Sequence, residues 1–501
     1  MESKLKQLNR GFICQNNNTD LIERVLQFGE GNFLRAFIDV FIDELNENGY
    51  FNGSIVIVQP IAQGMANDLN TQDGCYTVVL RGLENGTPVV RKRVVTSVRR
   101  AINPYTDYDT YINAIQNPHL RFVVSNTTEA GIAFAESDKL DDRPPSSFPA
   151  KIIALLYERY KLFNGDLSKG FILLPCELID NNGDTLKEIV LRYAAMWQLS
   201  QEFIDWVTKA NYFANTLVDR IVTGYPSESI NDFESELGYR DNLLVTGEVF
   251  HFLAIEAPKE ALREISDAMP FHKLGLNVAL TSDVTPYKLR KVRILNGGHT
   301  MSVLGAFLSG INTVGEMMDD PLFVNYLQKG ISQEIIPTLD LDEENLKTFA
   351  ASVFDRFANP YIKHNILSIA LNSVSKFSAR ILPTILDYHK KTGQLPELLC
   401  FSFAALLAFY KVEEIRDGTL IGIRGNSDEY QIADTPDVLA FFEALWHQQS
   451  NISKIVTKTC SQTSFWDMDL NLLPGFAEKI TEHLQNILHD GVKKTIQKIM
   501  E

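Results

Sequence analysis

The first third of the chain alternates short apolar runs with amphipathic segments, and this alternation limits the fold more than any other feature. Strands are predicted at 24–28 and 54–59, and a helix at 33–48 lies between them and ends at the Asn48-Gly49 turn signal. Further strands are predicted at 76–80, 89–95, 121–125 and 170–175, and a further helix at 150–163. Strands that alternate with helices form βαβ units, so this part predicts an α/β fold with a mostly parallel, doubly wound sheet.

After about residue 285 the pattern changes to long apolar or amphipathic segments. Helices are predicted at 287–308, 360–374, 398–410, 437–446 and 476–499. A chain of 501 residues is long enough for two domains with separate cores. The sequence therefore predicts an α/β domain over 1–284 and a largely helical domain over 285–501.

Charge and cysteine usage narrow the function classes. The formal charge of −16 argues against nucleic acid or an anionic membrane as the main partner, although a local basic pocket could still bind an anionic small molecule. The N-terminus lacks a signal-peptide core, and no run approaches 18 apolar residues, so a cytoplasmic location is expected. The five scattered cysteines are typical of reduced thiols rather than of disulfides or a zinc site. They are Cys14, Cys75, Cys176, Cys400 and Cys460.

The run QFGEGNFLRAF couples the first strand to the first helix through Gly29 and Gly31. Small residues here suit a dinucleotide loop, in which the backbone turns sharply and a helix N-terminus faces the pyrophosphate. The third glycine of G-x-G-x-x-G is missing, because Leu34 holds its place, and Ala36 is an alternative small contact. A strand–turn–helix that binds no ligand is the open alternative.

Two further loops follow predicted strands. The second strand ends at Gln59, which could hydrogen-bond ribose hydroxyls, and no Lys or Arg occurs before Arg81 to bind a 2′-phosphate, so NAD is favoured over NADP. The loop that contains Asn126, Thr127 and Glu129 follows the strand at 121–125, where a doubly wound sheet binds ligands. Side-chain turns or helix capping explain these loop residues equally well.

The segment YKLRKVRILNGGH carries Lys291, Asn296 and His299. In an α-helix these side chains would project at roughly 0°, 140° and 80°, so one face would present an amine, an amide and an imidazole. A lysine with a lowered pKa can exchange a proton with a carbonyl oxygen, an amide can donate to the developing oxyanion, and an imidazole can hydrogen-bond a hydroxyl. The alternative is a solvated basic helix with a capping asparagine.

Together, G-x-G-N-F-L-R-A and the later K-x4-N-x2-H resemble the polyol-specific long-chain dehydrogenase/reductase family, which includes mannitol dehydrogenases and hexuronate reductases. VSNTTEAGI (124–132), NTLVDRIVTG (215–224) and SFAALLAFYK (402–411) extend the resemblance over nearly the whole chain. It implies a Rossmann-type NAD-binding domain at 1–284, an all-helical substrate-binding and catalytic domain at 285–501, and a metal-independent active site in the cleft between them. The implied partner is a small keto-hexuronate, aldonate or polyol.

The resemblance also implies roles for individual residues. Lys291, Asn296 and His299 are expected to be catalytic, and Asp219 and Lys376 are expected to bind substrate. The residues expected to contact the nucleotide are Gly29, Gly31, Asn32, Phe33, Gln59, Asn126, Thr127 and Glu129. A non-catalytic nucleotide- or sugar-acid-binding protein is the alternative, but it predicts a degraded Lys-Asn-His set, whereas all three members are present.

The chain departs from the mannitol-type pattern at three places. Cys176-Glu-Leu178 replaces C-D-N, so a second oxyanion amide is not expected. Lys288 stands where an acid is usual and could pair with a hexuronate carboxylate, unless it is solvent-exposed and irrelevant. Ser368 replaces an arginine that polyol enzymes use.

Overall fold

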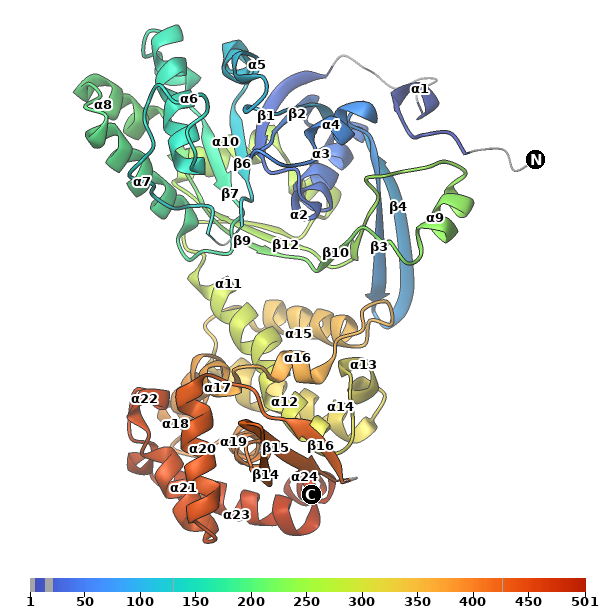
Figure 1. The fold of residues 1–501 in the computed structure, drawn as a ribbon, viewed down its shortest axis with the longest axis vertical. Coiled ribbons are helices and arrows are strands. Elements are labelled where there is room, and N and C mark those ends of the chain that lie inside the picture. The colour runs from blue at the N-terminus through green and yellow to red at the C-terminus, as the bar shows by residue number, and fades with distance from the viewer. Residues whose placement is uncertain (1–4, 14–20, 129, 426) are drawn as a thin grey trace. The chain divides into compact units, whose positions relative to one another are not determined.

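The computed structural model describes residues 5–13, 21–128, 130–425 and 427–501. The chain divides into two compact units. The first contains residues up to 82 together with 88–284, and the second contains 83–87 together with 285–501. Figure 1 shows the elements of both units.

A six-stranded, all-parallel sheet forms the centre of the first unit, in the order β5-β2-β1-β6-β7-β8. This is the 3-2-1-4-5-6 order of a doubly wound Rossmann fold, which confirms the predicted fold class. The strands are β1 (Ile22–Phe28), β2 (Gly53–Val58), β5 (Val98–Ile102), β6 (Phe122–Ser125), β7 (Ile172–Pro175) and β8 (Tyr212–Phe213).

The apolar runs of β2, β6 and β7 are continuous and fully buried because both faces of the sheet are covered. Val25, Ile55 and Val124 join one core, whereas Leu26 and Val56 join the core on the opposite face. The helices of this unit include α3 (Ile38–Glu47), α6 (Phe148–Leu162), α7 (Asn182–Met196) and α8 (Gln201–Ala210). The others are α1 (Arg10–Ile13), α2 (Asn32–Arg35), α4 (Ala66–Thr71), α5 (Tyr108–Asn113), α9 (Ile230–Leu237) and α10 (Lys259–Ala268).

The segments at 76–80 and 89–95 do form strands, but their expected place in the parallel sheet is wrong. They are β3 (Tyr76–Glu84) and β4 (Thr87–Val95), joined only by Asn85-Gly86, in a second sheet of order β10-β11-β3-β4 (Figure 1). Asn85 and Gly86 have φ of 52° and 74°, as a two-residue hairpin turn requires. Much of β4 is exposed, as expected for an edge strand.

The remaining strands of the first unit complete its smaller sheets. The second sheet is finished by β10 (Val222–Gly224) and β11 (Val245–Glu248). A three-stranded sheet of order β13-β12-β9 consists of β9 (Asn215–Asp219), β12 (Phe252–Glu256) and β13 (Val278–Thr281). Asp219 and Arg220 lie where β9 ends, so this small sheet fixes their positions.

The second unit is helical, but the expectation of an all-helical domain is wrong in one detail. A three-stranded antiparallel sheet is formed by β14 (Glu414–Arg416), β15 (Thr419–Arg424) and β16 (Asp428–Gln431). Its first turn is Asp417-Gly418, with φ of 51° and 77°, so the same turn chemistry creates a hairpin inside helical surroundings.

The helices that surround the candidate site are α11 (Thr285–Arg290), α12 (Gly297–Leu308), α15 (Glu343–Phe357), α16 (Ile366–Ala370), α17 (Ser373–Arg380) and α19 (Glu397–Phe409). The others are α13 (Val314–Met318), α14 (Pro321–Lys329), α18 (Leu382–Thr392), α20 (Pro436–Gln448), α21 (Ile452–Cys460), α22 (Thr463–Trp466), α23 (Phe476–Asp490) and α24 (Val492–Met500). No described helix is both long enough and apolar enough to cross a membrane.

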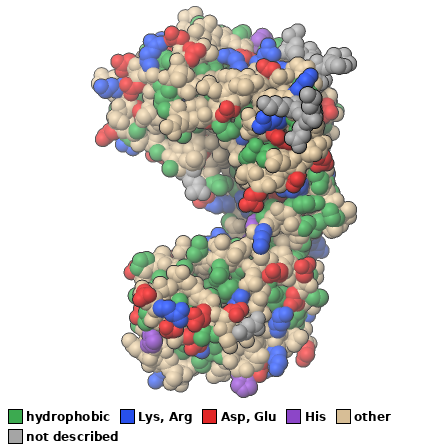
Figure 2. Space-filling view, turned by 45° about the vertical axis from the view of Figure 1, so that its right-hand side comes forward, with side chains coloured by type: hydrophobic (Ala, Val, Ile, Leu, Met, Phe, Trp, Pro, Cys, Tyr) green, Lys and Arg blue, Asp and Glu red, His purple; other side chains and the backbone are tan. Residues whose placement is uncertain are grey.

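Figure 2 shows acidic and basic side chains interspersed on the face in view.

Three predicted helices differ in detail from the structure. The helix at 33–48 breaks after Arg35, because the carbonyl of Ala36 accepts a hydrogen bond from Arg220. The segment 360–374 is helical only from Ile366, since residues 364–366 bond to the backbone of 312–314 instead. The helix at 476–499 is interrupted at Gly491, where φ is 84°.

Candidate active site

The glycine turn after β1 contains two glycines with different roles. Gly29 has φ of 120°, and a Cβ added there would lie 2.7 Å from the carbonyl oxygen of Asn126, so only glycine fits. Gly31 has φ of −65°, and a Cβ added there would meet nothing within 4 Å. The packing of the protein therefore does not require glycine at position 31. The open space beside Gly31 would allow a dinucleotide to approach the backbone closely.

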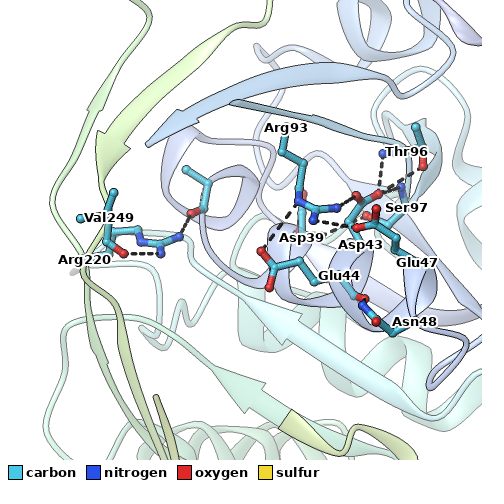
Figure 3. Close-up of polar contacts among 11 residues, drawn as sticks. Asp39, Asp43, Glu44, Glu47, Asn48, Arg93, Thr96, Ser97, Arg220 and Val249 are labelled. Carbon is cyan, nitrogen blue, oxygen red and sulfur yellow. Dashed lines mark hydrogen bonds and ion pairs between the residues drawn. The ribbon is translucent and has the colours of Figure 1, made fainter. Parts of the chain in front are cut away.

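Two buried arginines hold this turn in place. Arg35 donates to the carbonyl of Glu30 at 3.0 Å and to Asn32 Oδ1 at 2.7 Å. Arg220 donates to the carbonyls of Ala36 at 2.5 Å and Val249 at 3.2 Å, and burial lowers its pKa to about 10 (Figure 3). Leu34, in the third-glycine position, is fully buried, and Phe33 packs on Phe37 at 5.0 Å.

Helix α3 connects the turn to the sheet through carboxylates (Figure 3). Asp43 accepts hydrogen bonds from the backbone N–H of Thr96 at 2.7 Å and of Ser97 at 3.1 Å, and it pairs with Arg93 at 2.8 Å. Asp39 is fully buried and accepts a hydrogen bond from the Tyr76 hydroxyl at 2.7 Å. Burial raises the pKa of Asp39 to about 7, against the opposing effect of its hydrogen bonds.

The side chain of Gln59 is occupied by its own loop. Its Nε2 donates to the carbonyls of Ile61 at 2.8 Å and Ala62 at 3.1 Å, and its Oε1 accepts from the N–H of Ala66 at 3.2 Å. The side chain is buried and supports residues 60–66. This arrangement gives Gln59 a structural role that is independent of any ribose.

The loop after β6 is tied down by a buried carboxylate. Glu177 accepts from the N–H of Thr127 at 3.0 Å, from its hydroxyl at 2.9 Å and from the Ser125 hydroxyl at 3.0 Å. Asn126 donates to the carbonyl of Cys176 at 2.7 Å, and Leu178 is 62% exposed. Glu177 stands at the position of the aspartate in the C-D-N motif of the mannitol-type pattern. In this structure its carboxylate holds the loop after β6 in place. Glu129 lies outside the described residues.

In the second unit, the segment with the candidate catalytic residues is helical but not uniformly α-helical. Residues Lys291–Asn296 form a π turn between α11 and α12, and Gly297 N–H bonds to the carbonyl of Val292, five residues back. Such i→i+5 turns are rare and are frequent at functional sites. Since Lys291 and Asn296 are five residues apart, this turn places them on nearly the same side of the helix rather than roughly 140° apart.

His299 follows on α12 in apolar and cationic surroundings. Its ring stacks on Phe357 at 4.0 Å and meets His364 edge-on at 6.1 Å. The pKa of His299 is lowered to about 3, mainly by burial and also by the nearby His364, Arg356, Arg380 and Lys376. Its Nε2 is sealed from solvent and has no hydrogen-bond partner in the described parts of the chain. The imidazole is therefore neutral at ordinary pH.

Helix α17 brings two further cations to this region. Lys376 donates to the carbonyl of Ile369 at 2.8 Å, and Arg380 donates to the Thr300 hydroxyl at 3.4 Å. Thr300 in turn donates to the carbonyl of Asn296 at 2.9 Å. Sequence reasoning singled out Lys376 but missed Arg380.

The other predicted residues are distributed over both units. Asp219 is buried where β9 ends, and Lys288 is half-buried on α11. Asn296 and Lys291 are also half-buried, and the Asn296 amide has no partner among the residues that the structure describes. Cysteines 75, 176, 400 and 460 are buried and are not in disulfide bonds, whereas Cys14 lies outside the described residues. No cluster of three or more His, Cys, Asp or Glu suited to a metal occurs in the described ranges.

Comparison with known families gives matches in both units. Residues 23–266 match the mannitol dehydrogenase Rossmann domain, and residues 283–488 match the mannitol dehydrogenase C-terminal domain. Together these matches span most of the chain.

Individual relatives agree with this assignment. The chain is 46% identical to an altronate oxidoreductase of Yersinia enterocolitica and 47% identical to one of Klebsiella pneumoniae, over 95% of this chain and 96% of each relative. Among solved structures, mannitol 2-dehydrogenase of Pseudomonas fluorescens, in a ternary complex with NAD and D-mannitol, covers 99% of both chains at 23% identity and a TM-score of 0.64. A D-sorbitol dehydrogenase covers 96% of both chains at 22% identity and a TM-score of 0.78. These two structures share the fold.

Proposed function

The chain belongs to the mannitol dehydrogenase family, and from this premise we propose that it is an NAD-dependent oxidoreductase that interconverts tagaturonate and altronate. The relatives named altronate oxidoreductase, at 46–47% identity over 95% of the chain, support this choice of substrate. The observation that carries the proposed chemistry is the π turn that brings Lys291 and Asn296 to one side of the helix, one turn before the neutral His299.

The proposed roles follow from the chemistry of these groups. The Asn296 amide donates to the ketone oxygen and stabilises the negative charge that develops on it. Lys291 gives this oxygen a proton during reduction and accepts it during oxidation. His299, held neutral, hydrogen-bonds the same oxygen or an adjacent hydroxyl through its imidazole ring. Bound NADH supplies the two-electron reducing equivalent.

The nucleotide is proposed to bind the first unit at Gly29, Gly31, Asn32 and Phe33, where Gly31 leaves open space. Asn126 and Thr127 belong to the same proposed region, at the carboxyl end of β6. No Lys or Arg occurs between Gln59 and Arg81, so no cation there is available to a 2′-phosphate. We therefore propose NAD rather than NADP.

The proposed substrate is a sugar acid, and the second unit supplies positive charge for it. Lys376 and Arg380 lie near His299, and Lys288 lies on the helix before it. Asp219 of the first unit is proposed to bind a substrate hydroxyl. A cytoplasmic location is proposed because the buried cysteines at 75, 176, 400 and 460 are not in disulfide bonds.

A spectrophotometric assay of NADH oxidation with tagaturonate, fructuronate and fructose tests the proposal. We expect tagaturonate to give the highest kcat/KM. A preference for fructuronate would indicate the epimeric mannonate reaction, and a preference for fructose would indicate a mannitol dehydrogenase. Nucleotide binding without turnover of any of the three would indicate a binding protein and would contradict the proposal.

A further inference from the structure

We propose that Arg380 binds the substrate carboxylate and thereby makes the site selective for sugar acids over neutral sugars. This inference rests on the proposed function, because it assumes that the substrate is a sugar acid and identifies the residue that binds its carboxylate. Sequence comparison with polyol enzymes does not point to it, since the arginine that those enzymes use is replaced by Ser368.

Arg380 and Lys376 form a pair of like charges on one helix. They lie four residues apart on α17, so their side chains project from the same face, where like charges repel. Both are partly buried, and burial lowers the pKa of each, while Arg380 lowers the pKa of Lys376 further. The fold thus holds two positive charges together in a partly desolvated place.

Neither cation has an acidic partner in the described part of the chain. Lys376 is held by the carbonyl of Ile369, and Arg380 makes only a long contact of 3.4 Å with Thr300 Oγ1. The acid that acts electrostatically on Lys376 is Asp434, which accepts a hydrogen bond from the Tyr410 hydroxyl.

Other partly buried cations of the same unit are paired. Arg293 meets Asp387 at 2.7 Å, and Arg424 meets Asp428 at 3.2 Å. An uncompensated charge in a partly buried place is unfavourable unless an anion completes it. The Arg380 guanidinium is therefore available to bind an anion, whereas the paired cations already contact a carboxylate.

The position of Arg380 identifies that anion as part of the substrate. Thr300 links the guanidinium to the carbonyl of Asn296, and Arg380 is close enough to His299 to lower its pKa. The proposed ketone-binding groups and the unpaired guanidinium are thus neighbours within one unit. A planar guanidinium presents two parallel donors, which match a carboxylate in a way that a lysine ammonium does not.

Three variants test this inference. Arg380→Met removes the charge at similar length, and Arg380→Lys keeps the charge but loses the paired donors. Arg416→Met is the control, because it removes a cation that is exposed and paired with Glu414 and Glu429 on the surface of the same unit. Each is assayed with NADH against tagaturonate and against uncharged fructose. Binding is measured separately, as the rise in melting temperature caused by altronate or by mannitol.

For Arg380→Met we expect kcat/KM for tagaturonate to fall roughly 10- to 100-fold, mainly through KM, as the loss of a charge-assisted hydrogen bond predicts. Activity on fructose should change less than twofold, and the stabilisation by altronate should disappear. Arg380→Lys should recover part of the loss, and Arg416→Met should behave like the wild type.

The outcomes separate this inference from the proposed function. If the wild type prefers tagaturonate and Arg380→Met keeps that preference, the inference about Arg380 is wrong and the proposed function stands. A fourth variant, Lys288→Met, is assayed in the same way: if it abolishes the preference while Arg380→Met does not, the carboxylate lies at Lys288 and the inference about Arg380 is wrong. If the wild type prefers fructose, both are wrong. Equal losses on tagaturonate and fructose would show that Arg380 supports the fold rather than the carboxylate.

Discussion

The imidazole of His299 lies stacked on the ring of Phe357, with ring centroids 4.0 Å apart and planes inclined by 13°. The stack fixes the ring orientation and leaves the sealed Nε2 without a partner in the described part of the chain. A neutral ring held in this way can donate to or accept from a substrate oxygen, but it cannot act as a standing positive charge.

The first prediction concerns the charge of His299. Because its pKa is lowered to about 3 in the folded protein, its ring resonances should not titrate between pH 5 and 8. NMR of labelled histidine, with His299→Asn for assignment, checks this, and a midpoint inside the window would contradict it. The unfolded chain binds this proton below about pH 6.5 and the folded chain only near 3, so His299 lowers the free energy of unfolding as pH falls through this range.

The second prediction concerns the stack itself. Phe357→Leu keeps an apolar side chain but removes the flat surface under His299, so the imidazole should lose its fixed orientation. We expect kcat to fall roughly tenfold, since small displacements of positioned groups are costly for turnover. Phe354→Leu, on the same helix, is the matched control. An equal loss in both variants would indicate a general weakening of α15 rather than a role for the stack.

The third prediction concerns the proton-transfer group. Lys291→Ala should reduce kcat by roughly 10²–10⁴ if the amine protonates the ketone oxygen. Fluorescence titration should give unchanged NADH binding, because Lys291 is assigned to the substrate and not to the nucleotide. Lys347→Ala removes an exposed lysine that pairs with Glu343 and serves as the control. Full activity of Lys291→Ala would remove this residue from the mechanism.

The fourth prediction separates the two glycines of the turn. Gly29→Ala forces a Cβ to 2.7 Å from a backbone carbonyl at φ of 120°, so it should lower stability by roughly 1–3 kcal/mol. Gly31→Ala meets nothing within the protein, so its melting temperature should equal that of the wild type. If NADH approaches this turn, Gly31→Ala should nevertheless weaken NADH binding at least several-fold. Wild-type affinity in Gly31→Ala would mean that no ligand occupies the open space.

The fifth prediction concerns Asp39, whose pKa is raised to about 7. The folded chain keeps this proton up to about pH 7 and the unfolded chain loses it near 4, so stability is lost as pH rises through this range, at no more than about 1.4 kcal/mol per pH unit. Asp39→Asn cannot ionise, so relative to the wild type it should gain stability between pH 5 and 8. Melting curves with exposed Asp141→Asn as control test this, and a parallel pH dependence of both proteins would contradict it.

Most of the parallel sheet could be predicted, because β2, β6 and β7 are apolar runs and β1 contains a shorter one. The strands β5 (VRRAI) and β8, which consists of two half-buried residues, carry no such run and are missed by sequence reasoning. The hairpin of β3 and β4 differs from the predicted parallel arrangement although its signal is local: Asn85-Gly86 separates the two strands, and this dipeptide is a strong hairpin signal. The same applies to Asp417-Gly418 in the second unit. Turn chemistry, rather than apolar periodicity, identifies these smaller sheets.

The other differences depend on hydrogen bonds that only the folded chain reveals. The break after Arg35 arises because Arg220, 184 positions further along the chain, takes the carbonyl of Ala36. The occupied amide of Gln59 depends on the path of its own loop, which no residue pattern specifies. Arg380 is an ordinary arginine in the run SKFSAR, and only the tertiary structure reveals that it has no acidic partner among the described residues.

The π turn has a consequence for anyone who transplants this trio of groups into a designed scaffold. Four residues lie between Lys291 and Asn296. In the wider π turn this spacing brings the two side chains to nearly the same side of the helix. On an ideal α-helix the same count would point the two groups roughly 140° apart, and one oxygen could not reach both. A faithful graft must therefore copy the widened winding, or shorten the spacer by one residue.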